Sequence, residues 1–172
     1  MSEVGVPDPG QGCVWVDADG CPQAVKEILI RAAERTGVNM VMVANRLIKT
    51  PPHLHNIRCT VVPPGFDAAD KRIAELAQPG DLVIASDIPL AAEVIEKGAQ
   101  VIGFRGEEHD LASIRQRLVM RDLMETLRAS GIQSSGPAAY GQQDKQRFGN
   151  ALDRALSLMR RKGSGKRAQG PA

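Results

Sequence analysis

Val14-Trp15-Val16-Asp17-Ala18-Asp19-Gly20-Cys21-Pro22 is an apolar run that ends in two carboxylates and a turn. A helical pattern of apolar residues follows directly after it. An apolar strand that leads through acids and a turn into a helix is typical of the first unit of an open α/β sheet. In such sheets, ligands bind just beyond the carboxyl ends of the strands. The stretch therefore predicts both a fold class and the edge of the sheet at which to look for a site.

The two acids of this stretch are candidates for chemistry. Residues two apart in an extended chain project to the same side, so Asp17 and Asp19 can face one ligand together. Two anions that close repel each other unless a cation or a shared proton relieves them, and Mg²⁺ or Mn²⁺ is the simplest such cation. The alternative is that one carboxylate caps the next helix and the other is solvated.

The composition restricts the class of protein. The chain has 172 residues, of which 42% are hydrophobic and only 3% aromatic, with a net charge of +2. These values suit one α/β domain with tails, and they argue against a strongly basic nucleic-acid binder. Three cysteines without paired spacing indicate reduced thiols in a cytoplasmic protein. The absence of a signal peptide and of a long apolar run predicts no membrane association.

Strands and helices alternate along most of the chain. The patterns predict strands at 13–16, 39–44, 57–62, 82–85 and 101–104, and helices at 22–37, 67–77, 90–97, 113–129 and 144–159. This order predicts a mostly parallel sheet of about five strands with helices on both faces, followed by C-terminal helices. In the helix at 113–129, we expect Ile114, Leu118, Leu123 and Leu127 to face inward. The predicted organisation is a flexible arm (1–11), one domain (12–159) and a disordered basic tail (160–172).

Three further acids fall at predicted strand-to-helix junctions. Asp67 and Asp70 open the second helix and can share one of its faces, and Asp87 follows the strand at 82–85. Each has an ordinary explanation as well, because Asp67 and Asp87 suit N-cap positions and Asp70 suits a first helical turn.

A parallel sheet brings all of these junctions to one edge, so five acids (Asp17, Asp19, Asp67, Asp70 and Asp87) are expected there together. A carboxylate-lined Mg²⁺ or Mn²⁺ site that hydrolyses phosphodiesters is the interpretation we favour. We expect catalytic roles for Asp17, Asp67, Asp70 and Asp87, and phosphate contacts from Lys71, Arg72 and Arg121.

Several motifs resemble those of the YaiI/YqxD family of uncharacterised bacterial proteins. They are the opening stretch at 14–22, Gly65-Phe66-Asp67-Ala68-Ala69-Asp70, Gly80-Asp81-Leu82-Val83-Ile84-Ala85-Ser86-Asp87-Ile88-Pro89, Met120-Arg121-Asp122-Leu123-Met124 and Phe148-Gly149-Asn150-Ala151-Leu152-Asp153. The resemblance covers about residues 13–159, in order. Gly20 is a mild departure, since the family commonly has Ala there.

That family is similar to PIN-like domains, which are three-layer α/β/α domains with acids around divalent metal and nuclease activity in many members. By position, Asp17 and Asp87 match two of the acids, and Asp67 or Asp70 stands where another enters. Asp19 would be an additional acid. The resemblance implies a nuclease acting on nucleic acid, with RNA as the expected substrate, and supplies no specific target.

Two other functions stay open. The Asp17-x-Asp19-Gly20 pattern resembles that of haloacid-dehalogenase-type phosphatases, but Ala44-Asn45 lacks the hydroxyl that such enzymes carry after the second strand. The arginine-bearing helices after residue 110 also suit a non-catalytic nucleic-acid-binding module. The sequence leaves open a homodimer, the role of the Ser134–Pro137 loop and the role of Cys21.

Overall fold

The computed structural model describes residues 11–65, 67–132, 136 and 138–167, with side chains as far as Lys162. Most of the predicted arm, together with Ser134, Ser135 and Pro137, therefore lies outside the described residues. The elements follow the predicted alternation: β1 (Cys13–Asp17), α1 (Gln23–Thr36), β2 (Asn39–Ala44), β3 (Ile57–Val61), α2 (Ala68–Leu76), β4 (Leu82–Ile84), α3 (Ile88–Glu96), β5 (Gln100–Ile102), α4 (Leu111–Ala129) and α5 (Gln142–Arg167).

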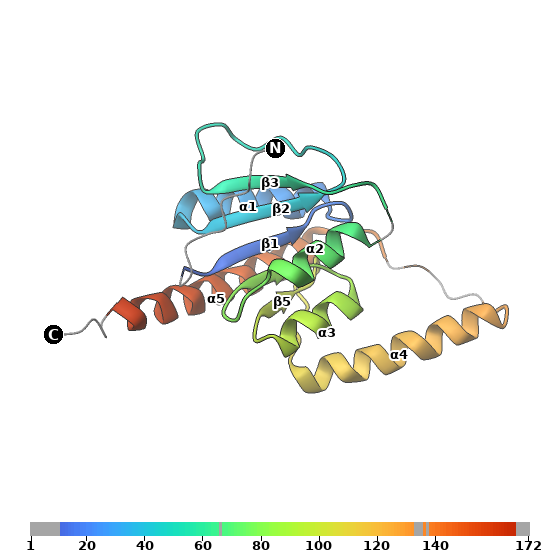
Figure 1. Cartoon of the computed structure of the whole chain (residues 1–172). Coiled ribbons are helices and arrows are strands. Elements are labelled where there is room, and N and C mark those ends of the chain that lie inside the picture. The colour runs from blue at the N-terminus through green and yellow to red at the C-terminus, as the bar shows by residue number, and fades with distance from the viewer. Residues whose placement is uncertain (1–10, 66, 133–135, 137, 168–172) are drawn as a thin grey trace.

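The five strands form one parallel sheet in the order β3-β2-β1-β4-β5, with β1 at its centre (Figure 1). The register places Asp17 of β1 beside Val43 of β2, and Val16 beside Ile84 of β4. The predicted fold class is thus confirmed. Because all strands run the same way, the ends of β1, β2 and β4 meet at one edge of the sheet.

Helices cover both faces of the sheet, and the alternation of side chains along β1 divides the core. Val14 and Val16 pack in a cluster with residues of α1 and α5, such as Leu29 and Phe148. Trp15 points to the other face, into a cluster with residues of α2 and α3, such as Ile73. A central strand buried on both faces explains why its sequence is continuously apolar rather than alternating.

At the amino edge of the sheet, Asp81 is the anchor of a buried hydrogen-bond network. Its carboxylate accepts the backbone N–H of Cys13 at 3.0 Å, the indole N–H of Trp15 at 2.9 Å and the backbone N–H of Gln78 at 2.8 Å. These bonds join the start of β1 to the turn before β4, and they satisfy a carboxylate that is only 6% exposed.

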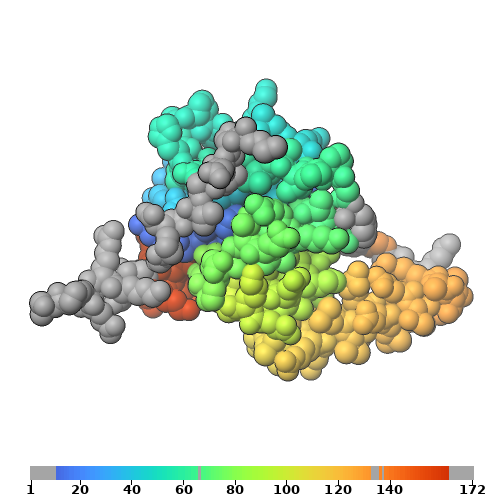
Figure 2. Space-filling model, in the orientation of Figure 1, coloured from blue at the N-terminus to red at the C-terminus, as the bar shows by residue number. Residues whose placement is uncertain are grey.

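Helix α4 corrects one prediction. Ile114 is the only residue of this helix that is buried, whereas Leu118 and Leu127 are half-buried and Leu123 is 51% exposed. The predicted inward stripe therefore holds only near the start of the helix, where α4 packs on α3. The C-terminal half of α4 stands away from the rest of the domain (Figure 2).

Helix α5 runs to Arg167, eight residues beyond its predicted end at Met159. Residues 160–167, which the sequence assigned to a disordered tail, therefore continue the helix, and residues 168–172 lie outside the described part. The buried face of α5 includes Phe148, Leu152 and Leu156, which pack against the sheet. Within the described ranges, no helix has the length and apolar character needed to cross a membrane.

Candidate functional site: a carboxylate cluster at the sheet edge

Three acids from two segments converge at the carboxyl edge of the sheet. Asp67 and Asp70 begin α2, and Asp87 lies between β4 and α3. One carboxylate oxygen from each of the three lies within 4.8 Å of the others. Asp67 is exposed, and the other two are half-buried, so the group opens to solvent on one side.

The backbone of Asp67 explains how its side chain becomes available. The residue occupies the N-cap position of α2 but has a left-handed conformation, with φ of 63°, and its side chain makes no capping hydrogen bond. The interpretation of Asp67 as an ordinary N-cap is therefore wrong. A non-glycine residue pays a conformational cost at such an angle, although Asp tolerates it better than most. Here the carboxylate turns toward Asp70 and Asp87 instead of the helix end.

Asp87 serves as a true N-cap. Its Oδ1 accepts the backbone N–H of Leu90 at 2.8 Å, as the capping interpretation predicted. This role does not exclude a second one, because a carboxylate has a further oxygen and further lone pairs. The cap instead fixes the orientation in which Asp87 meets the other acids.

Asp17 joins the cluster through Asp70. The two side chains share a hydrogen bond, which requires a proton on one of them. Burial, followed by the carboxylates of Asp70, Asp19 and Asp87, raises the pKa of Asp17 to about 7. Burial also raises the pKa of Asp70, although its hydrogen bond with Asp17 opposes this. The pair therefore holds a proton near neutral pH when no cation is present.

Asp19, the additional acid, accepts a hydrogen bond from the backbone. Both of its carboxylate oxygens accept the backbone N–H of Asn45, each at 3.0 Å. The side chain thus ties the loop after β1 to the end of β2 and does not belong to the group of three. It still raises the pKa of Asp17 and of Asp70 through its charge, so it lies close to both.

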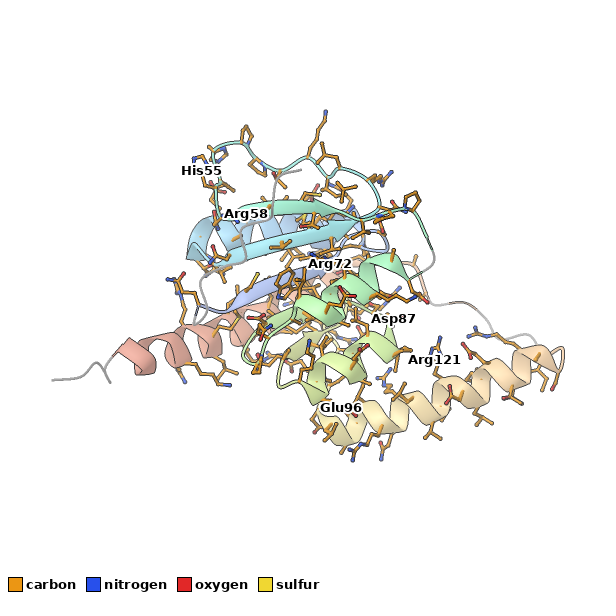
Figure 3. The ribbon with its side chains drawn as sticks, in the orientation of Figure 1. His55, Arg58, Arg72, Asp87, Glu96 and Arg121 are labelled. Atoms are coloured by element: carbon orange, nitrogen blue, oxygen red, sulfur yellow. The ribbon has the colours of Figure 1, made fainter. Side chains whose placement is uncertain are left out.

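The three cations that we expected to contact phosphate are Lys71, Arg72 and Arg121. Arg72 pairs with Glu75 at 3.2 Å on α2, and Arg121 pairs with Glu125 at 3.1 Å on α4. Lys71 is exposed directly after Asp70. Figure 3 shows Arg121 on the side of α4 that faces the part of the domain carrying Asp87. No ion pair between the described residues joins any of these cations to the cluster acids.

The donor set fits a hard divalent cation. It consists of carboxylate oxygens alone, with neither a thiolate nor an imidazole in the group. Such donors suit Mg²⁺ and Mn²⁺. Cys21, whose role the sequence left open, is buried, and burial raises the pKa of its thiol to about 12. That thiol is therefore not activated as a nucleophile.

The sequence did not predict the contacts that hold the segment after β5 next to Ser86 and Asp87. Arg105, just after β5, binds Asp144 at 2.9 Å and lies over the ring of Tyr140, whose hydroxyl donates to the carbonyl of Phe104. The backbone N–H of Phe104 donates in turn to the hydroxyl of Ser86, beside Asp87. These contacts connect residues that are far apart in sequence, and no local pattern indicates them.

Comparison with known proteins places the chain among uncharacterised bacterial proteins. Residues 15–158 match the family model described as "Uncharacterized BCR, YaiI/YqxD family". A UPF0178 protein of Cronobacter sakazakii is 55% identical over 148 residues, which are 86% of this chain and 97% of that protein. Another from Thioalkalivibrio sulfidiphilus is 57% identical over 84% of this chain and 97% of its own length. No solved structure gives a significant match. The chain therefore belongs to the YaiI/YqxD family.

Proposed function

We propose that this protein is a Mg²⁺- or Mn²⁺-dependent phosphodiesterase of PIN-like type that cleaves RNA. The observation that carries the proposal is the convergence of Asp67, Asp70 and Asp87 within 4.8 Å, with Asp17 hydrogen-bonded to Asp70. The resemblance of the sequence motifs to PIN-like domains adds support, because acids at these positions accompany nuclease activity there.

Electrostatics favours a bound cation. Four carboxylates at one sheet edge repel one another, and burial together with this repulsion raises the pKa of Asp17. A divalent ion would remove the need for the shared proton. Asp67, Asp70 and Asp87 would hold it, and Asp17 would orient Asp70. When bound, the ion would stabilise negative charge on a phosphodiester and favour deprotonation of a water.

The chain's own residues would do the remaining work. Asp17, beside Asp70, would be ionised once the ion is bound, and its carboxylate would then be available to accept a proton. Lys71 follows Asp70 directly in the sequence and is exposed. Arg72 and Arg121 would have to leave Glu75 and Glu125, their partners on the same helices, to contact a phosphate.

One alternative is less well supported by the geometry. A phosphatase of the haloacid-dehalogenase type would use Asp17 as nucleophile and Asp19 as acid and base. Both oxygens of Asp19 accept the Asn45 N–H, so this carboxylate serves to hold a loop. The phosphatase mechanism also gives no role to Asp67, whose carboxylate lies close to those of Asp70 and Asp87.

The test is cleavage of fluorescent single-stranded RNA by protein stripped with EDTA and then supplied with Mn²⁺ or Mg²⁺. Asp87→Asn removes a charge but keeps an oxygen for the Leu90 cap, so the fold should be retained. We expect this variant and Asp70→Asn to lose about 10- to 100-fold in rate, as for the loss of a group that supports a metal site.

The matched control is Asp153→Asn, which neutralises an exposed acid of α5 that pairs with Arg35. It should cleave like the wild type. Cleavage that Asp87→Asn retains would come from a contaminating nuclease and would contradict the proposal. Tight RNA binding without any metal-dependent cleavage would instead identify a non-catalytic binding module.

A further inference from the structure

A cavity of about 320 Å³ opens between the start of α1 and the segment that follows β2. It is lined by three cations, one amide and three aliphatic side chains: Lys26, Arg46, Lys49, Gln23, Ile30, Leu47 and Ile48. A cavity of this size is at the lower end of the range for small-ligand sites. Its lining contains no acid, in contrast to the cluster described above.

The cavity lies at the same edge of the sheet as the carboxylates. Helix α1 begins just after β1, and Arg46 comes two residues after β2 ends. Since β1 and β2 are parallel neighbours, both segments emerge on the carboxyl side. Asp19 lies near both the cavity and the carboxylate cluster. It accepts the N–H of Asn45, next to Arg46, and its charge raises the pKa of Asp17 and of Asp70.

The cations of the cavity, Lys26, Arg46 and Lys49, form no ion pair with an acid among the described residues. Arg46 and Lys49 are exposed, and Lys26 is half-buried in the first turns of α1. Three cations that converge on one cavity without acids provide an attractive site for an anion with several oxygens.

The N-terminal end of α1 adds to the positive electrostatic potential of the cavity. Its N-cap is Pro22, which supplies no side-chain hydrogen bond, and its first turn contains no acid. The N-terminal end of a 14-residue helix carries partial positive charge and unpaired N–H groups that suit a phosphate. Gln23, the first residue of α1, lines the cavity.

The rim of the cavity has apolar character. Leu47 is 75% exposed, the highest fraction among the large apolar side chains in the described part of the chain. An apolar group beside a phosphate site suits the sugar or base that adjoins a phosphate, whereas an isolated phosphate ion would leave it in water.

We propose that Lys26, Arg46 and Lys49 bind a backbone phosphate of the single-stranded nucleic acid whose neighbouring phosphodiester is cleaved at the carboxylate cluster. This inference rests on the proposed function for the cleavage step, but the binding site itself requires no metal. The nucleic-acid strand would run along the carboxyl edge of the sheet from β4 to β2, with one of its phosphates bound in the basic cavity. The acids would then engage the phosphodiester next to it.

The test is fluorescence anisotropy of a labelled oligouridylate of about 12 nucleotides, titrated with protein in EDTA at about 50 mM salt. The variant Lys26→Ala/Arg46→Ala/Lys49→Ala should weaken binding at least about 10-fold and reduce the slope of log K against log salt by about 0.7, as for the loss of one phosphate contact on a single strand. All three side chains are partly or fully exposed, and circular dichroism would verify folding.

The control variant Arg160→Ala/Arg161→Ala/Lys162→Ala removes the same charge from exposed positions near the end of α5. This control variant should change the affinity for the oligonucleotide by less than about 2-fold, because salt screens charges that are far from the bound strand. Equal weakening in both triple variants, or none in the cavity variant, would overturn the proposal. Saturable binding of inorganic phosphate that depends on the three cations, without oligonucleotide binding that depends on them, would also overturn it, since the cavity would then be a site for the free ion.

The outcomes separate this inference from the proposed function. Asp87→Asn should bind the oligonucleotide in EDTA at least as tightly as the wild type, because it removes a negative charge. If no variant or wild-type protein cleaves RNA but binding depends on the cavity, the proposed function fails and the binding site stands. If the cavity variant binds and cleaves like the wild type, the proposed function stands and the binding site fails.

Discussion

Single residues at the carboxyl edge have distinct tasks although they are all aspartates. Asp87 caps a helix, Asp19 holds a loop, and Asp67 takes a left-handed backbone that frees its side chain. The sequence predicted that these acids would share an edge, because strand-to-helix junctions can be recognised from periodicity. It could not assign their tasks, since the φ angle of Asp67 and the Asn45 contact of Asp19 depend on tertiary packing.

The raised pKa of Asp17 predicts how stability depends on pH. In the folded protein without metal, Asp17 keeps its proton to higher pH than in the unfolded chain, so its contribution to the free energy of unfolding falls as pH rises between about pH 4 and 7. In EDTA at about pH 8, Asp17→Asn should therefore be more stable than the wild type by about 1–3 kcal/mol. Urea unfolding at several pH values measures this. A destabilised Asp17→Asn at that pH would contradict the assigned proton.

The two roles of Asp87 can be separated by two substitutions. Asp87→Ala removes both the cap on Leu90 and the ligand oxygen, whereas Asp87→Asn removes only the charge. We expect Asp87→Ala to lower the free energy of unfolding by about 1 kcal/mol and Asp87→Asn to leave it nearly unchanged in EDTA. Equal destabilisation by both would mean that the charge, rather than the hydrogen bond, stabilises the start of α3.

Among the elements, α4 departs most from its sequence pattern. Its apolar spacing is that of a helix buried along its whole length, yet only Ile114 near its start is fully buried. Periodicity reports that a helix has an apolar face, but it does not report whether another element covers that face. The strands were easier to predict, because β1, β2 and β4 are buried on both faces and their sequences are continuously apolar.

This difference within α4 predicts the cost of two core-like substitutions. Ile114→Ala should lower the free energy of unfolding by about 2–4 kcal/mol, because it leaves a cavity between α4 and α3. Leu123→Ala should cost less than about 0.5 kcal/mol, because this side chain is 51% exposed. Chemical denaturation of the two variants compares them. A large cost for Leu123→Ala would show that something covers the far half of α4.

On the scale of the whole molecule, the two edges of the sheet use aspartate for opposite purposes. At the amino edge, Asp81 is buried and fully hydrogen-bonded, and at the carboxyl edge the acids face one another and solvent. The sequence did not reveal the role of Asp81, because its donors, Cys13 and Trp15, are far away in the chain. It did indicate the functional edge, since parallel topology alone brings the junctions together.

This contrast predicts which acids stabilise the fold. Asp81→Ala should lower the free energy of unfolding by about 3 kcal/mol, because it leaves the N–H groups of Cys13, Trp15 and Gln78 without their acceptor. Asp70→Asn should not destabilise the metal-free protein, because it relieves the repulsion of Asp70 with Asp87, Asp67 and Asp19. Thermal unfolding in EDTA checks both, and a strongly destabilised Asp70→Asn would assign that acid to the fold instead of the site.

The central claim is that Asp67, Asp70 and Asp87 form a site for a divalent cation, and calorimetric titration of Mn²⁺ into EDTA-stripped protein tests it most directly. We predict saturable binding by the wild type and by Asp153→Asn, with proton release below about pH 7 as Asp17 ionises. Asp87→Asn should lose at least about 10-fold in affinity. No saturable binding at millimolar Mn²⁺, or equal binding by Asp87→Asn, would contradict the account and leave these acids as helix caps and solvated chain ends.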